Sequence, residues 1–275
     1  MRILEPHTLG GRPRSIVAAV HRSLVAQELL LQRLLDAVET RSVARPPLAQ
    51  QLTALVKTFE RPRVLRRLVR SMKRLYPDLP VVLVDDSREA TSIPGAQTVA
   101  MPYDSGISAG RNEGLRHVET PYVLVLDDDF VFYRHTDLGW ALALMDRYPA
   151  IDIMGGRVID LPLMRARRLT EGDVFPTDRP PRMPLGSLLG GLRVVDRVPN
   201  FYVARRDRLE LVPWDERLKL AEHTDFFTRA LGILTTVFTP DLRCLHARTP
   251  LDTEYMKKRM DLAESLQVLE ERYGR

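Results

Sequence analysis

The chain has 275 residues, 44% of them hydrophobic, so it can form one large domain or two small domains with a substantial core. No stretch reaches the length of a membrane span, the N-terminus has no secretory pattern, and the single Cys244 excludes an intrachain disulfide framework. These features predict a cytoplasmic protein, and the net charge of +5 suits anionic small molecules or a membrane surface as well as nucleic acid.

Residues 1–50 are expected to form an N-terminal helical extension. Residues 1–14 contain Gly10-Gly11 and two prolines and should be irregular, and Ser15 is expected to cap a helix that runs to about Thr40. Apolar side chains recur near one face of this helix, at Ile16, Val20, Leu24, Leu31, Leu34 and Val38. Such a stripe is typical of a core or of contact with a partner helix, so oligomerisation through this helix is one expectation. A helix lying on a membrane is less favoured.

The main domain is expected to begin near Gln51 with a strand at 52–56, followed by a helix that starts at Pro62. The helix carries apolar residues on one side and arginines on the other, at positions 63, 66, 67, 70 and 74. A basic stripe of this kind is usually a solvated face. The more specific interpretation is that the basic face is attracted to anionic lipid. The protein would then bind peripherally to the inner face of the membrane.

Two further strands are expected at 80–84 and 97–101, the first ending in Asp85-Asp86. A turn with Gly106 and Gly110 then opens a helix that carries Arg111 near its start. Helix N-termini favour anions, and a guanidinium adds a planar donor fork for phosphate. Strand, turn and helix alternate from 52 to 126, which is typical of a doubly wound nucleotide-binding unit.

Three aspartates, Asp127, Asp128 and Asp129, follow directly after the apolar run Val123–Leu126, which suits a buried strand. Uncompensated carboxylates at such a strand end are costly, so a positive partner is expected. In an extended chain Asp127 and Asp129 point the same way and can share one hard cation, while Asp128 points elsewhere. An acidic loop after a strand is the alternative interpretation.

The second half is expected to hold a helix at 137–148, strands at 151–159, 200–204 and 242–246, and a helix opening at 221–222. A closing helix is expected from Asp252 to Tyr273. The opening of the middle helix brings two carboxylates close together, Glu222 and Asp225, with His223 between them. A carboxylate in such a place can act as a general base that takes a proton from a hydroxyl group, and helix capping is the alternative role for both.

Several motifs together resemble the GT-A glycosyltransferases of family 2, most closely the β-1,4-N-acetylgalactosaminyltransferases that make gangliosides. These motifs are Lys57-Thr58-Phe59, Asp85-Asp86-Ser87, Ala109-Gly110-Arg111-Asn112, Asp127–Phe132, Gly155-Gly156, Asn200-Phe201, Ala204-Arg205 and His223–Phe227. The resemblance covers about 52–248 and implies a GT-A α/β fold, with a Rossmann-like, mostly parallel sheet flanked by helices. It divides the domain 51–275 into a nucleotide-sugar half (51–130), an acceptor and catalytic half (131–250) and a C-terminal helix (251–275).

The resemblance also implies the reaction. The chain would transfer a sugar with inversion from a UDP-sugar, N-acetylgalactosamine or another hexose, to a glycan or glycolipid in surface polysaccharide synthesis, and no nucleic-acid partner is implied. Asp225 matches the family's acidic position and is expected to be the base, with Glu222 as the alternative and His223 as an orienting group. Mn²⁺ or Mg²⁺ would be bound by Asp127, Asp129 and His246. Donor-binding residues would be Lys57, Thr58, Glu60, Asp85, Asp86, Arg111, Asp128 and Asn200.

Two other functions remain open at this point. A nucleotidyltransferase of a sugar phosphate shares the layered α/β architecture, but its Gly-rich loop after the first strand is replaced here by Lys57–Glu60. A catalytically inactive nucleotide-sugar-binding module would keep the fold and lose the acids. The three aspartates and the acid at 225 argue against it.

Overall fold

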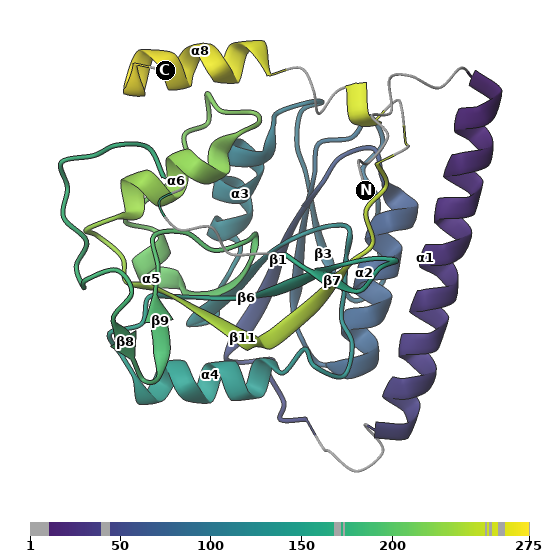
Figure 1. The fold of residues 1–275 in the computed structure, drawn as a ribbon, viewed down its shortest axis with the longest axis horizontal. Coiled ribbons are helices and arrows are strands. Elements are labelled where there is room, and N and C mark those ends of the chain that lie inside the picture. Colours follow the sequence, from purple (N-terminus) through teal and green to yellow (C-terminus); the bar gives the residue numbers. More distant parts are fainter. Residues whose placement is uncertain are drawn as a thin grey trace.

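The computed structural model describes residues 11–39, 45–167, 172, 174–250, 252, 255–257 and 262–274, with side chains from residue 15 onward. Figure 1 shows a sheet that crosses the middle of the molecule with helices on both sides. The helices are α1 (Gly11–Glu39), α2 (Pro62–Leu75), α3 (Ile107–Arg116), α4 (Leu138–Arg147), α5 (Arg206–Leu209), α6 (Glu222–Ala230) and α8 (Ala263–Tyr273). The strands are β1 (Leu52–Thr58), β2 (Val81–Asp85), β3 (Gln97–Ala100), β4 (Tyr122–Asp127), β5 (Phe130–Val131), β6 (Ile153–Asp160), β7 (Arg165–Ala166), β8 (Leu188–Leu189), β9 (Leu192–Val194), β10 (Phe201–Arg205) and β11 (Thr236–His246).

The sheet has the strand order β3-β2-β1-β4-β10-β6-β11-β9-β8. The pairs β3/β2, β2/β1, β1/β4 and β6/β11 are parallel, and β10 runs antiparallel between β4 and β6. The register aligns Lys57 with Asp127 and Thr58 with Asp85. The carboxyl ends of β1, β2 and β4 therefore meet at one edge, and the predicted mostly parallel α/β sheet with flanking helices is confirmed.

Both faces of the sheet are covered by apolar side chains. One face packs against α2 and α4 through residues such as Leu65, Met72 and Leu142. The other face packs against α3, α5 and α6, with Leu115, Leu209 and the Phe226-Phe227 pair fully or nearly buried. Burial on both faces explains why the central strands read as continuous apolar runs rather than as alternating patterns.

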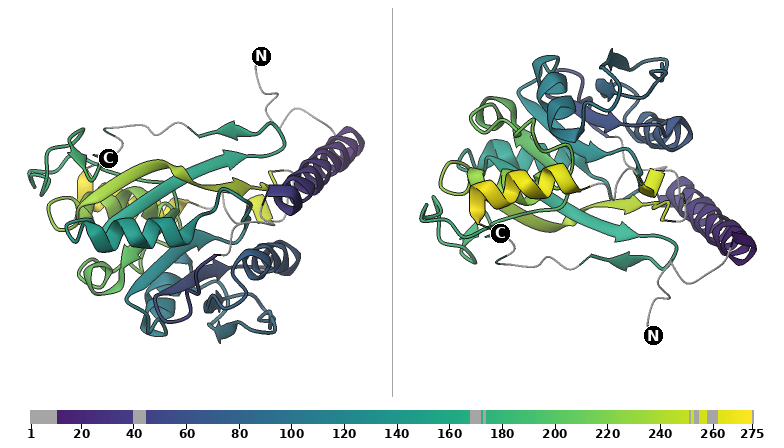
Figure 2. Two further views of the ribbon diagram at one scale, coloured as in Figure 1. Left: turned by 90° about the horizontal axis from the view of Figure 1, so that it is seen from below. Right: turned by 90° about the horizontal axis from the view of Figure 1, so that it is seen from above.

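The helix α1 lies along one edge of the molecule in the views of Figures 1 and 2, beside α2. It begins at Gly11, earlier than expected, and packs on the body through Val25 and Leu29. The buried carboxylate of Asp36 fixes it further by accepting from Arg74 and from the backbone N–H of Arg134. The apolar stripe predicted from the sequence is on the opposite, exposed side, so it does not contribute to the core of this chain.

The other predicted elements agree within a few residues, apart from the C-terminal segment, where α8 begins at Ala263 rather than at Asp252. Residues 253–254 and 258–261 lie outside the described part of the chain. Of the basic stripe on α2, Arg67 and Arg74 bind the body, and the other three arginines are exposed. Within the described residues no helix has the length and apolar character needed to cross a bilayer. Approach to anionic lipid stays a prediction.

Candidate active site

A cavity of about 590 Å³ opens where the carboxyl ends of β1 and β4 meet the first turns of α3 and α6. The C-terminal segment completes its wall. Its described lining residues are Lys57, Phe59, Arg61, Asp104, Gly106, Ile107, Asp127, Asp128, Asn200, Lys219–His223, Tyr255, Leu262, Glu264 and Ser265. Ligands of open α/β sheets bind beyond the carboxyl ends of strands, so the position of this cavity agrees with the expected nucleotide-sugar site.

The three aspartates after β4 have different surroundings. Asp127 is part-exposed at the cavity wall, and its Oδ1 lies 3.2 Å from Arg111 and 3.4 Å from the amide of Asn200. Asp128 is buried and accepts from the hydroxyl of Thr58 at 2.7 Å. Asp129 turns toward the end of β11, where its Oδ1 lies 3.1 Å from Nε2 of His246. The three carboxylates therefore point in different directions, and only that of Asp127 lies beside Arg111 and Asn200.

Arg61 is the positive partner that the buried carboxylates require. Its guanidinium binds both oxygens of Asp128 and lies 3.2 Å from Asp129. Burial opposes its charge, but the two aspartates outweigh this effect and raise its pKa. Burial also raises the pKa of Asp128 to about 6, although Arg61 acts in the opposite direction. The ring of Tyr255 covers the guanidinium at 3.8 Å, so the C-terminal segment shields this ion cluster.

The two glycines before and within α3 make room for Lys57 and for the chain that leads into α6. A side chain at Gly110 would meet Cγ of Lys57 at 2.7 Å, and Gly106 has a φ of 91°, a region that favours glycine. The N–H of Gly106 donates to Asp86 at 3.0 Å, and Lys57 forms an ion pair with the same carboxylate. Lys57 lines the cavity, whereas the buried Asp86 holds the lysine and the turn in position.

Arg111 does not line the cavity, which corrects its predicted role as a direct phosphate ligand. It is 2% exposed, with one nitrogen 2.6 Å from Oε1 of Glu222 and another 3.2 Å from Oδ1 of Asp127. Burial disfavours its charge, but the two carboxylates outweigh that penalty and raise its pKa. A buried guanidinium needs such partners, so Arg111 positions two cavity carboxylates from behind the wall.

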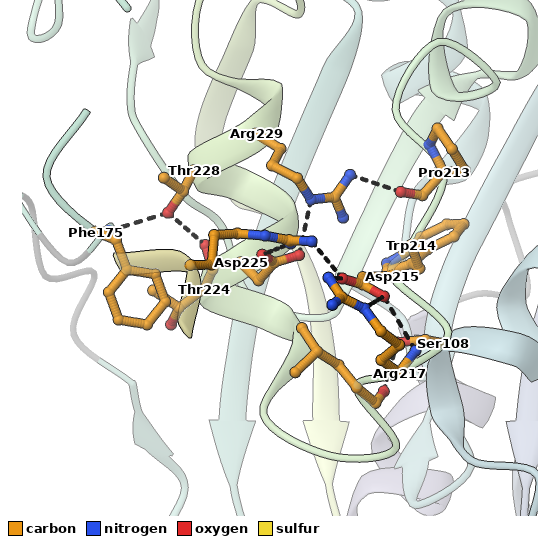
Figure 3. A network of polar contacts seen from close by, with 12 residues as sticks. Ser108, Phe175, Pro213, Trp214, Asp215, Arg217, Thr224, Asp225, Thr228 and Arg229 are labelled. Atoms are coloured by element: carbon orange, nitrogen blue, oxygen red, sulfur yellow. Dashed lines mark hydrogen bonds and ion pairs between the residues drawn. The ribbon is translucent and has the colours of Figure 1, made fainter. Parts of the chain in front are cut away.

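The first turn of α6 supplies Glu222 and His223 to the cavity but not Asp225. Asp225 is fully buried, and its carboxylate accepts from Arg229 at 2.8 Å and from the hydroxyl of Tyr273 at 2.9 Å, with a further ion pair to Arg272. Figure 3 shows Asp225 and Arg229 of α6 in this network, facing Asp215. The structure therefore favours Glu222 over Asp225 as the base, since both oxygens of Asp225 are engaged away from the cavity.

His223 is half-buried at the cavity wall, with its ring 5.1 Å from that of Phe227. Burial, with smaller contributions from Arg111 and Arg197, lowers the pKa of His223 to about 3. The ring is therefore neutral at neutral pH and can accept a hydrogen bond at one nitrogen.

The three predicted metal ligands do not converge on one point. His246 meets Asp129, and its Nδ1 lies 2.7 Å from Asp160, while Asp127 belongs to the Arg111 group. Burial opposes charge on His246, but hydrogen bonds to Asp129 and Asp160 raise its pKa, so it acts as a donor there. Among the described residues no cluster of three or more His, Cys, Asp or Glu side chains could hold a metal ion. A cation bound jointly with substrate phosphates needs only one or two carboxylates, and Asp127 is the predicted ligand at the cavity wall.

Three other predicted donor-binding residues lie outside the cavity lining. Asp85 accepts from the backbone N–H groups of Ser87 and Thr91, and Glu60 accepts from that of Arg88. Thr58 donates to Asp128, as described above. Asp85 and Glu60 thus stabilise the loops after β1 and β2, and Thr58 stabilises the loop after β4. The sequence positions of these residues do not distinguish this structural role from contact with a ligand.

Sequence reasoning missed Arg61, Lys219 and the C-terminal contribution. The position of Arg61 just before the proline that opens α2 was a usable signal, because three adjacent aspartates require a buried cation. Lys219 is part-exposed at the cavity, 3.9 Å from Glu264. Nothing local in 255–265 indicates that Tyr255 and Ser265 line the cavity, because this contact depends on the path of the chain after β11.

Comparison with known proteins identifies the family. Residues 53–210, more than half of the chain, match the family Glycosyl transferase family 2. The chain belongs to glycosyl transferase family 2.

The particular relatives are sugar transferases. Beta-1,4 N-acetylgalactosaminyltransferase 1 of Homo sapiens is 36% identical over 211 residues, which cover 71% of this chain and 39% of the relative. Beta-1,4 N-acetylgalactosaminyltransferase 2 of Mus musculus is 32% identical over 205 residues, covering 72% of this chain and 40% of the relative. The chain thus spans about two fifths of the length of these proteins, and the resemblance seen in the motifs is confirmed.

Solved structures show the same fold. TarS 1-349 of S. aureus superposes with a TM-score of 0.55 at 19% identity, covering 71% of this chain and 60% of TarS. The same protein has been solved with UDP-GlcNAc, and that structure gives a TM-score of 0.54 at 18% identity, covering 71% of this chain and 58% of TarS. The predicted GT-A fold is confirmed.

Proposed function

We propose that the protein transfers a sugar from a UDP-sugar to a hydroxyl group of a glycan or glycolipid, with inversion at the anomeric carbon. The observation that carries this proposal is the cavity itself. In a chain of family 2, the carboxylates of Asp127 and Glu222 line one cavity and are joined behind its wall by Arg111. One acid lies at the end of β4 and the other at the start of α6.

Uridine nucleotides are the donors that the relatives support. TarS has been solved with UDP and with UDP-GlcNAc, and the curated relatives are named for N-acetylgalactosamine. We propose UDP-N-acetylgalactosamine as the first donor to test. The role in surface polysaccharide synthesis belongs to the same proposal, and it rests on the resemblance alone.

Glu222 is proposed as the general base in place of Asp225. It lines the cavity, and its ion pair with Arg111 holds the carboxylate in a fixed position at the wall. In the transfer step the acceptor hydroxyl attacks the anomeric carbon, the bond to the UDP oxygen breaks, and Glu222 takes the hydroxyl proton. His223, one residue further along the cavity wall, is the second candidate.

Lys57 is proposed to face the anionic part of the donor, because it is the cavity lysine fixed by a buried partner, Asp86. Asp127, together with diphosphate oxygens, would hold Mn²⁺ or Mg²⁺. When bound, such a cation supplies positive charge that stabilises the leaving diphosphate. Asp129 is not proposed as a ligand, since Arg61 and His246 already bind its carboxylate.

A screen of nucleotide sugars tests the donor. We expect UDP-N-acetylgalactosamine and UDP to raise the melting temperature, by roughly 2–4 °C for each kcal/mol by which the ligand at the concentration used stabilises the fold, because ligands that bind only the folded state stabilise it. A CMP-linked sugar is the matched control and should have no effect. If no uridine nucleotide stabilises the protein, the proposal is contradicted. Binding without transfer to any acceptor would point to an inactive module.

The stereochemistry is tested by NMR assignment of the product. A β-linked product from an α-linked donor supports inversion.

The cation can be tested separately by calorimetric titration of UDP with and without Mn²⁺. We expect Mn²⁺ to tighten binding to the native protein by about tenfold or more, equivalent to about 1.4 kcal/mol. Asp127→Asn should lose this gain, because it removes the ligand charge at the cavity wall. Asp129→Asn should keep it. Loss of the gain in both variants would restore the original assignment of Asp127 and Asp129 as joint ligands, and retention of the gain in Asp127→Asn would refute the revised assignment.

A further inference from the structure

The exposed side of α1 carries apolar side chains that no described part of the chain covers. Val38 is 75% exposed and Leu34 is 59% exposed, while the opposite side of the helix is buried through Val25, Leu29 and Asp36. Since the buried side already fixes α1 to the body, the exposed side is a preformed surface with a defined orientation. Figure 2 shows the helix α1 at the outer edge of the molecule.

The spacing of these residues identifies the kind of partner. Seven of the exposed positions alternate by three and four residues over three heptads, with the exposed Ile16 and Leu30 beside them: Val17, Val20, Leu24, Gln27, Leu31, Leu34 and Val38. We call this set the seam. A period of 3.5 residues is the pattern that keeps one face of a helix against another helix in a coiled coil. Every member of the seam is exposed.

The charge distribution argues against a lipid surface. The seam contains no charged residue, and the exposed arginines of α1 with described side chains, Arg22 and Arg33, lie off it. Helices that lie on membranes are rich in Lys and Arg on the polar face, and lipid does not select a heptad spacing. A second copy of the chain presents the same uncharged seam without electrostatic repulsion, and twofold pairing is the commonest symmetry of soluble oligomers.

We propose that α1 pairs with α1 of a second copy as a parallel, in-register coiled coil. Gln27, at the middle of the seam, decides the orientation. In a parallel pair it faces the partner's Gln27, and the two amides can hydrogen-bond. In an antiparallel pair it would face a leucine and lose its polar partner. A single polar seam residue is a known device for fixing register. Because each body packs on the side of α1 away from the seam, the two bodies lie on opposite outer sides of the pair.

Light scattering on the full chain tests the pairing. The native protein should have the mass of two chains, and the double variant Leu24→Glu/Leu31→Glu should have the mass of one, with an unchanged circular dichroism spectrum because both residues are exposed. Arg22→Glu/Arg33→Glu, on the same helix but off the seam, is the matched control and should keep the mass of two chains. A native protein with the mass of one chain overturns the proposal, and so does a paired Leu24→Glu/Leu31→Glu variant. A single-chain native protein that sediments with phosphatidylserine vesicles would assign the seam to lipid.

Cysteine substitution tests the orientation. The one native cysteine, Cys244, is buried, so an added thiol on α1 is the accessible one. Under mild oxidation Val20→Cys should form an interchain disulfide, because the two copies of a residue near one end of the seam approach closely only in the parallel pair. Ala19→Cys, which is exposed but off the seam, should not. A native dimer in which Val20→Cys stays uncrosslinked would refute the parallel arrangement.

Discussion

Glu222→Gln should lower the kcat of sugar transfer by about 10²- to 10⁴-fold, the usual contribution of a general base, while donor binding survives. Glutamine keeps the size of the side chain and can still accept a hydrogen bond from Arg111, but it cannot take a proton from the acceptor. Glu222 is buried against Arg111 yet lines the cavity, so the change acts at the reacting end of the site. Single-turnover rates and the dissociation constant of UDP would separate the two effects.

Two neighbouring variants serve as controls for this assignment. Asp225→Asn should leave kcat within a few fold and lower stability instead, because it weakens the network with Arg229, Arg272 and Tyr273. His223→Gln tests the second candidate, the neutral imidazole at the cavity wall. If His223→Gln abolishes transfer and Glu222→Gln does not, the base is His223. Normal turnover by all three variants would refute a base on this helix.

Arg111→Ala should destabilise the fold by about 3–5 kcal/mol, the cost of removing one partner from a buried ion pair. The substitution leaves Glu222 without its cation and removes the nearest positive charge from Asp127. The midpoint of urea unfolding gives the measurement, and the slope m should not change.

An exposed arginine on the same helix gives the matched control. Arg116 is 69% exposed and pairs with Glu113, so Arg116→Ala should change stability by no more than about 1 kcal/mol. Arg111→Lys should fall between the two, because it keeps the charge but loses the fork that joins two carboxylates. If Arg111→Ala were as stable as Arg116→Ala but failed to bind UDP, the original interpretation of Arg111 as a direct phosphate ligand would stand.

Much of the fold could be predicted from sequence because local patterns agree with the global topology. The apolar runs at β1, β2 and β4 are buried on both faces, and Pro62 and Gly106 mark where helices begin. Short loops and parallel strands then bring the strand ends to one edge. The C-terminal segment was less predictable, since its contacts depend on where the chain passes after β11.

The sequence predicted where the acidic side chains of the site lie, but it did not predict which side chains bind them. The sequence indicated that Asp127, Asp128 and Asp129 end a buried strand, yet it carries no information on which arginine meets which carboxylate. Arg61 is more than sixty residues earlier, and Arg111 binds acids from two different elements. The sequence pattern favoured Asp225 as the base and could not show that Arg272 and Tyr273, from a helix at the far end of the chain, bind its carboxylate away from the cavity.

The buried position of Asp225 has a consequence for local unfolding. Two of its three side-chain partners come from α8, so detachment of that helix would leave a buried carboxylate with Arg229 alone. The free-energy cost of leaving this carboxylate without two of its partners couples α8 to α6. The first turn of α6 carries Glu222. Backbone amides of α6 and α8 would then exchange with solvent deuterium as one cooperative unit, at a lower opening free energy than the central strands.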